Sequence, residues 1–178
     1  MIENIKTLGN ALELFRTKNW MGNDNCIFLA YKDNSADGAK AGAAGVLGGA
    51  IGGAIGAFAA GMEQGMNAKE LGLGVYAGLL INQTEYGLGI FPLYNKGIAL
   101  TLNIDKMELD SEKFIIIKNE ELQNITVKNY NIFNKKMQKI IITLKNGTTL
   151  KLMAKINEKQ IPYQQENMTK LMGRYGKK

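Results

Sequence analysis

The chain has 178 residues, and 46% of them are hydrophobic, so it can bury a core and is not a disordered segment. It contains no histidine and a single cysteine, Cys26, which excludes a histidine base, a cysteine zinc site, an internal disulfide and a cysteine–histidine nucleophile. The formal charge of +6 is uneven, because residues 91–178 carry sixteen bases and eight acids whereas residues 1–90 carry six bases and eight acids. This asymmetry indicates either an anionic partner for the second half or a solvated lysine-rich sheet.

Residues 1–36 are predicted to form an amphipathic helix followed by a short strand. The helix is expected over residues 2–18, where large apolar side chains recur at helical spacing: Ile2, Ile5, Leu8, Leu12 and Phe15. The acids Glu3 and Glu13 interrupt this segment, which therefore lacks the apolar stretch of a signal peptide, and we expect a cytoplasmic protein. The run CIFLAYK, residues 26–32, predicts a buried strand.

Residues 37–69 are predicted to form a helix rich in glycine and alanine. Its centre, residues 41–62, carries no charge, and its large side chains fall on one face: Leu47, Ile51, Ile55, Phe58 and Met62. Glycines recur four residues apart toward the other side, at Gly45, Gly48, Gly49, Gly52, Gly53 and Gly56. This segregation predicts a glycine zipper, in which a second backbone approaches the glycine face closely.

Two environments suit this zipper helix. As a helix, the 22 uncharged residues would extend roughly 33 Å, enough to cross the hydrocarbon core of a bilayer. In the other environment the glycine face packs on another helix or on a neighbouring subunit. We favour the membrane because no charge interrupts the run.

Residues 70–178 are predicted to form an antiparallel β domain that ends in a helix. Strands are expected over residues 71–82 and 86–94, joined by a turn, then over 97–104, 114–118 and 124–129, with a polar connection at residues 105–113. Asn146 and Gly147 predict a type I′ turn between two arms whose apolar residues alternate with polar ones. Pro162 is suited to the first turn of the closing helix, whose apolar face is Met168, Leu171, Met172 and Tyr175.

The outline of this β domain resembles bacterial PH-like and GRAM-like domains. The resemblance is carried by YAGLLINQTEYGLGIFPL, by FIIIKNEELQNITVKN, and by KMQKIIITLKNGTTLKLMAKI with the helix that follows. It implies an α+β fold, a bent antiparallel barrel or sandwich with the C-terminal helix in one open end, and a binding module for lipids, peptides or self-assembly. The basic signature of phosphoinositide-binding members is absent from the first hairpin, which contains Glu85 and no base, so that ligand is not implied.

Most patterns that resemble a catalytic or metal site fail on inspection. The segment from Asp33 begins like a calcium loop but has Ala44 where the closing glutamate belongs. The glycines at 72 and 74 mimic a dinucleotide fingerprint but precede a strand instead of a helix. The acids between Asp105 and Glu112 are expected to be solvated. No cofactor or metal is therefore predicted.

Three lysines, Lys135, Lys136 and Lys139, lie beside Phe133 and are the candidate contact for an anionic partner. A basic loop next to an aromatic side chain is typical of contact with anionic lipid or nucleic acid. The alternative, favoured by the sequence alone, is a hairpin edge that lysines protect from aggregation.

Together these patterns predict a non-enzymatic, PH-like binding or assembly module that self-associates and is tethered to the inner face of the membrane by its zipper helix. The alternative is a soluble homo-oligomeric structural protein in which the zipper is the seam between subunits. Nucleic-acid binding through the lysine-rich sheet has weaker support. The expected partners are therefore further copies of the chain and anionic lipid.

Overall fold

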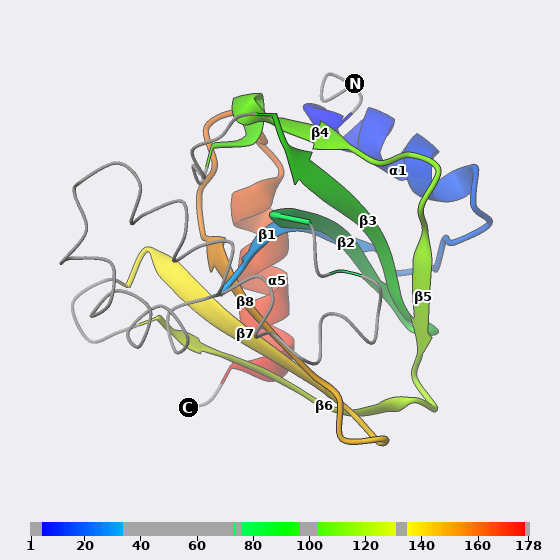
Figure 1. The fold of residues 1–178 in the computed structure, drawn as a ribbon. Coiled ribbons are helices and arrows are strands. Elements are labelled where there is room, and N and C mark those ends of the chain that lie inside the picture. The colour runs from blue at the N-terminus through cyan, green and yellow to red at the C-terminus, as the bar shows by residue number, and fades with distance from the viewer. Residues whose placement is uncertain (1–4, 34–72, 74–75, 97–102, 131–134, 177–178) are drawn as a thin grey trace, which may run out of the picture.

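The protein has an α+β fold built on one antiparallel sheet of eight strands, as the computed structural model shows for residues 5–33, 73, 76–96, 103–130 and 135–176 (Figure 1). The strands are β1 (Cys26–Lys32), β2 (Gly78–Thr84), β3 (Gly87–Asn95), β4 (Met107–Leu109), β5 (Ile115–Lys118), β6 (Leu122–Asn129), β7 (Met137–Leu144) and β8 (Thr149–Lys155). Two α-helices, α1 (Leu8–Arg16) and α5 (Gln164–Tyr175), and the short 3-10 helix η2 (Ile104–Lys106) complete the described elements. The predicted glycine zipper lies outside the described residues.

Strand β1 lies in the middle of the sheet, whose order is β4-β3-β2-β1-β8-β7-β6. Strand β5 pairs with β3 beyond the end of β4, so the two short strands share one edge. Because β1 pairs with both β2 and β8, residues 1–36 and 70–178 contribute strands to the same sheet. The two ends of the chain segment between β1 and β2 are adjacent, because the Lys32 N–H donates to the Ala77 carbonyl over 3.2 Å.

The sheet buries both of its faces around β1. Phe28 packs with inward residues of the other strands and with Met168 and Leu171 of α5. Ile27 and Leu29 point to the opposite face, where α1 contributes Ala11 and Phe15. Burial on both faces explains why β1 appears in the sequence as an unbroken apolar run.

The sheet opens between β1 and β8, and a side chain of α5 spans the opening. The two strands pair only at Tyr31 and Lys32. Beyond this point the buried amide of Gln164 accepts from the Leu29 N–H over 2.8 Å and donates to the carbonyls of Leu29 and Lys155 over 2.9 Å each. The amide thus satisfies backbone groups that a continuous strand ladder would have paired.

Helix α1 is shorter than predicted, but most of the predicted apolar face is confirmed, because Ile5 and Phe15 are buried and Leu12 packs against the same core. It begins after Thr7, whose hydroxyl accepts from the Asn10 N–H over 3.2 Å. Leu8, expected in the core, is 40% exposed, whereas Phe15 is fully buried. The Phe15 ring packs edge-on against Phe91, with 5.1 Å between ring centroids, and this aromatic contact sets which side of the helix faces the sheet.

The turn between β7 and β8 forms where it was predicted, but the type I′ assignment is wrong. The loop has three residues, 145–147, because the Leu144 N–H donates to the Thr148 carbonyl and the Gly147 N–H donates to the Leu144 carbonyl. Gly147 alone takes a positive φ, of 90°, and Asn146 accepts from the Thr148 N–H over 2.9 Å. These features define a type I turn followed by a glycine bulge.

Other strand boundaries also differ from the predictions. The first strand of the β domain starts at Gly78 instead of residue 71, and the connection expected to be irregular contains β4. Of the strand expected over 97–104, residues 97–102 lie outside the described residues and Ile104 begins η2. The predicted face of the closing helix is confirmed, since Met168 and Leu171 are buried and Met172 and Tyr175 pack against the same core.

We predict that Gln164→Ala lowers the free energy of unfolding by roughly 2–4 kcal/mol, because it leaves the backbone groups of Leu29 and Lys155 buried without partners. Chemical denaturation followed by circular dichroism measures this loss. Gln165→Ala is the matched control, because Gln165 is exposed and its replacement should change the stability by less than about 0.5 kcal/mol. Equal stability of the two variants would contradict a bridging role for Gln164.

Candidate functional site

A hollow of about 620 Å³ lies where β7 begins, β8 ends and the chain turns into α5. Its apolar lining comes from Met137 and Ile156. Four lysines, Lys135, Lys136, Lys155 and Lys159, line it together with Asn157 and Gln165. The hollow therefore combines an apolar lining with amines from two separate stretches of chain.

The register of the β7–β8 hairpin places these lysines together. Met137 lies opposite Lys155, and the Ile156 N–H donates to the Lys136 carbonyl over 2.9 Å, which extends the pairing by one step. A tight turn bridged between Glu158 and Ile161 then presents Lys159. Since Gln164 starts α5 directly afterwards, the same turn brings Gln165 to the hollow.

One of the four lysines has an acidic partner in the fold. The Lys155 amine lies 2.9 Å from a Glu158 carboxylate oxygen and 5.7 Å from the centre of the Tyr31 ring. The buried Glu158 also accepts from the Tyr31 hydroxyl over 2.9 Å. Burial, together with the neighbouring Glu158 carboxylate, raises the pKa of Tyr31 well above its usual value. This arrangement holds Lys155 in place at the margin of the hollow.

The other three lysines have no such partner in the described part of the chain. Among the described residues, no carboxylate lies within 4 Å of the amines of Lys135, Lys136 or Lys159, and all three residues are exposed. The hollow therefore carries a net positive charge that the described part of the chain does not neutralise. Such a site attracts anions.

The structure places only two of the three predicted lysines at this hollow. Lys135 and Lys136 line it, but the Lys139 amine lies 2.7 Å from a carboxylate oxygen of Asp33, whose side chain is 99% buried. Phe133 lies outside the described residues. Lys155 and Lys159 were missed because 19 or more residues separate them from Lys136, and only strand pairing brings them close.

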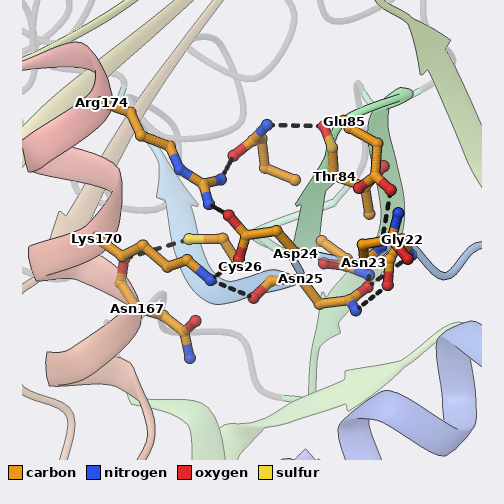
Figure 2. Close-up of polar contacts among 12 residues, drawn as sticks. Gly22, Asn23, Asp24, Asn25, Cys26, Thr84, Glu85, Asn167, Lys170 and Arg174 are labelled. Atoms are coloured by element: carbon orange, nitrogen blue, oxygen red, sulfur yellow. Dashed lines mark hydrogen bonds and ion pairs between the residues drawn. The ribbon is translucent and has the colours of Figure 1, made fainter.

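A second polar cluster ties α5 to the start of β1 (Figure 2). Lys170 and Arg174, one helical turn apart on α5, both pair with Asp24, and Arg174 also donates to Gln83. The hydrogen bond from Lys170 is the largest cause of the lowered pKa of Asp24, and the charges of Arg174 and Lys170 add to it, while desolvation acts in the opposite direction. Every charge in this cluster has an opposite partner, so it is a structural link between helix and sheet.

Next to this cluster, the turn before β1, residues 22–25, is hydrogen-bonded to the β2–β3 turn. The Asn23 N–H donates to a Glu85 carboxylate oxygen over 2.8 Å, and this bond is the largest cause of the lowered pKa of Glu85. Gly22 lies so close to Glu85 and Thr84 that any β-carbon at that position would collide with them. Figure 2 shows both turns beside the Asp24 cluster.

The remaining patterns from the sequence have structural roles where they are described. Asp110 accepts from the Tyr76 hydroxyl over 2.7 Å and from the N–H groups of Glu112 and Lys113, which closes its loop. In the part of the chain that the structure describes, no group of three or more acids or cysteines is arranged to hold a metal ion. None of the described helices has both the length and the apolar character needed to cross a bilayer.

Comparison with known proteins returned no match to a family model, to a curated protein or to a solved structure.

Cys26 is predicted to be an unreactive thiol in the folded protein. Its sulfur is fully buried and donates to the Asn167 carbonyl over 3.3 Å, and burial raises the thiol pKa to about 11. At pH 8 about one thiol in a thousand would be ionised, so a disulfide reagent such as DTNB should react slowly with the native protein and quickly in denaturant. Because the chain has one cysteine, the absorbance reports this site alone. Full labelling of the native protein within seconds would contradict the buried position.

Proposed function

We propose that this chain is a non-enzymatic binding module whose lysine-lined hollow takes the headgroup region of an anionic lipid. The observation that carries the proposal is the set of three lysines around an apolar lining, for which the described residues offer no carboxylate partner. Lys135, Lys136 and Lys159 supply positive charge, while Met137 and Ile156 suit the methylene groups next to a headgroup. A small hydrated anion would leave that apolar surface unused.

The charge of the hollow is suited to a membrane surface. Basic residues near an anionic leaflet contribute about 1 kcal/mol each to attraction, and the effect is screened by salt. Lysine is also well suited to this role, since its long methylene stem can lie on the apolar lining while its amine meets the anion. On this proposal the protein works at the inner face of the membrane.

The arrangement of the helix in the sheet supports a PH-like architecture as part of the same proposal. The resemblance implies a bent antiparallel barrel or sandwich with the C-terminal helix in one open end, and the antiparallel sheet with α5 packed on its core supports this part of the proposal. The proposed ligand site differs from that of phosphoinositide-binding members, because it lies beside the β7–β8 hairpin and away from the β2–β3 turn.

We predict that Lys135→Gln/Lys136→Gln weakens binding to vesicles of phosphatidylcholine with phosphatidylglycerol by roughly tenfold or more, because it removes two charges from the hollow. Sedimentation with vesicles measures the binding, and neutral phosphatidylcholine vesicles should bind neither form. Lys118→Gln/Lys145→Gln is the matched control. It removes the same charge at the other end of the β7–β8 hairpin and at the β5–β6 turn.

Equal losses in the two double variants would mean that net charge, and not the hollow, controls the binding. Binding of the native protein to neutral vesicles at the same strength would contradict an anionic ligand. Melting temperatures of all variants should stay close to that of the native protein, because the replaced side chains are exposed.

Self-assembly through the glycine-rich segment is the second candidate function. The observation that favours it is that this segment leaves and re-enters the sheet at one point, since Lys32 and Ala77 are hydrogen-bonded and the Lys32 amine donates to the Leu73 carbonyl over 3.3 Å. Such an insertion can serve assembly or membrane attachment while the sheet folds independently of it.

We therefore predict that the sheet tolerates replacement of residues 34–72 by a six-residue Gly/Ser linker, whose root-mean-square span is about 13 Å. Leu73 is retained because it is buried in the core. The excised protein should melt cooperatively within a few degrees of the native chain, while its oligomers, measured by light scattering, should dissociate. Loss of the cooperative transition would show that the sheet needs the segment, and unchanged oligomers would contradict a zipper seam.

A further inference from the structure

The outward face of β6, β7 and β8 carries lysines from each of the three strands. Lys128 lies opposite Lys139, which lies opposite Met153. Two residues further along each strand, Thr126 lies opposite Ile141, and Ile141 lies opposite Lys151. Residues directly opposite in an antiparallel pair project from the same face, so these side chains form one surface. We name the set Lys128, Lys139 and Lys151 the lysine face.

The lysine face continues into the hollow. Lys155 follows Lys151 and Met153 on the same side of β8, and Met137 precedes Lys139 on the same side of β7. Both Lys155 and Met137 line the hollow. The lysines of the strands and those of the hollow therefore belong to one continuous surface of the protein.

Acids neutralise only part of this surface. Asp33 pairs with Lys139 and Glu158 pairs with Lys155. Among the described residues, no carboxylate lies within 4 Å of the amines of Lys128 or Lys151, and both side chains belong to exposed residues. Because Asp33 offsets the charge of Lys139, the positive charge that an anionic partner would meet on this face comes from Lys128 and Lys151.

We propose that the lysine face docks flat on an anionic bilayer, with the hollow holding one lipid headgroup within the same contact. The inference extends the proposed function of the hollow and rests on it for the identity of the partner. Partly exposed Ile141 and Met153 lie between the lysines, a mixture suited to the interface of a bilayer. Met153 also packs against the core cluster that contains Ala11 and Phe15 of α1, so the lysine face borders the part of the sheet that α1 covers.

Two observations favour a bilayer over nucleic acid. Strands β6, β7 and β8 contain no aromatic residue, whereas surfaces that bind single-stranded nucleic acid present aromatic rings on which bases stack. Asp33, paired with Lys139 on this face, also immediately precedes the chain segment that contains the 22-residue uncharged run. The described chain before that segment therefore ends beside the lysine face.

The decisive variant is Lys128→Gln/Lys151→Gln, which removes two charges from the lysine face and leaves the hollow intact. Its affinity for phosphatidylglycerol vesicles should fall roughly tenfold, with a shallower dependence on salt. Its affinity for a soluble short-chain phosphatidylglycerol, measured by calorimetry below the micelle concentration, should equal that of the native protein. Lys128→Arg/Lys151→Arg should restore vesicle binding, and Lys106→Gln/Lys118→Gln is the control with the same change of charge.

The outcomes separate this inference from the proposed function. Native-like vesicle binding by Lys128→Gln/Lys151→Gln would overturn the docking face while leaving the hollow as a headgroup site. Failure of the native protein to bind the short-chain lipid would contradict the hollow as a headgroup site. A selective loss of vesicle binding in Lys128→Gln/Lys151→Gln would still support the lysine face as the docking surface. Binding of duplex or single-stranded DNA in place of vesicles, lost in the same variant, would overturn the bilayer and assign the face to nucleic acid.

Discussion

The opening between β1 and β8 is the constraint on which the rest of the structure depends. Adjacent strands of a twisted sheet can separate only if other groups satisfy the backbone donors and acceptors that are exposed by the separation. Here the Gln164 side chain satisfies them. Its amide has a donor and an acceptor in one plane, as a peptide group does, and can therefore replace a strand neighbour. The bridge also determines where α5 begins and how it enters the concave side of the sheet (Figure 1).

The candidate site follows from the same opening. Because the chain must leave β8 at Lys155 and start α5 at Gln164, the eight residues between them turn tightly at the end of the hairpin. That turn buries Glu158 against Tyr31 and leaves Lys159 exposed. Two lysines of the surface, Lys139 and Lys155, pair with buried acids and serve the fold. The other lysines of the surface face solvent and have no acidic partner in the described part of the chain.

Alternation of apolar residues was sufficient to predict most strands and the inner face of the hairpin. Ile140 and Ile142 on one arm and Leu150 and Leu152 on the other are buried as expected. The same alternation excludes a two-residue loop. Such a loop would set Leu144 opposite Thr149, but residues that lie opposite one another share a face, and Leu144 points inward whereas Thr149 points outward. The observed three-residue loop sets Ile142 against Leu150. The alternation of apolar residues therefore favours the three-residue loop over the type I′ turn at Asn146 and Gly147. The register of the three-residue loop also sets Lys155 opposite Met137.

The sequence by itself determined the fold class, the buried character of β1, the positions of most strands along the chain and the apolar face of α5, because periodicity and turn residues act over short distances along the chain. Tertiary structure alone decided the order of the strands in the sheet, the docking of α1, the bridge at Gln164 and the membership of the lysine surface. The docking of α1 depends on the contact of Phe15 with Phe91, and the bridge depends on the separation of β1 from β8. The lysine surface depends on which amines lie beside buried acids. Such contacts join residues remote in sequence, and no local pattern encodes them.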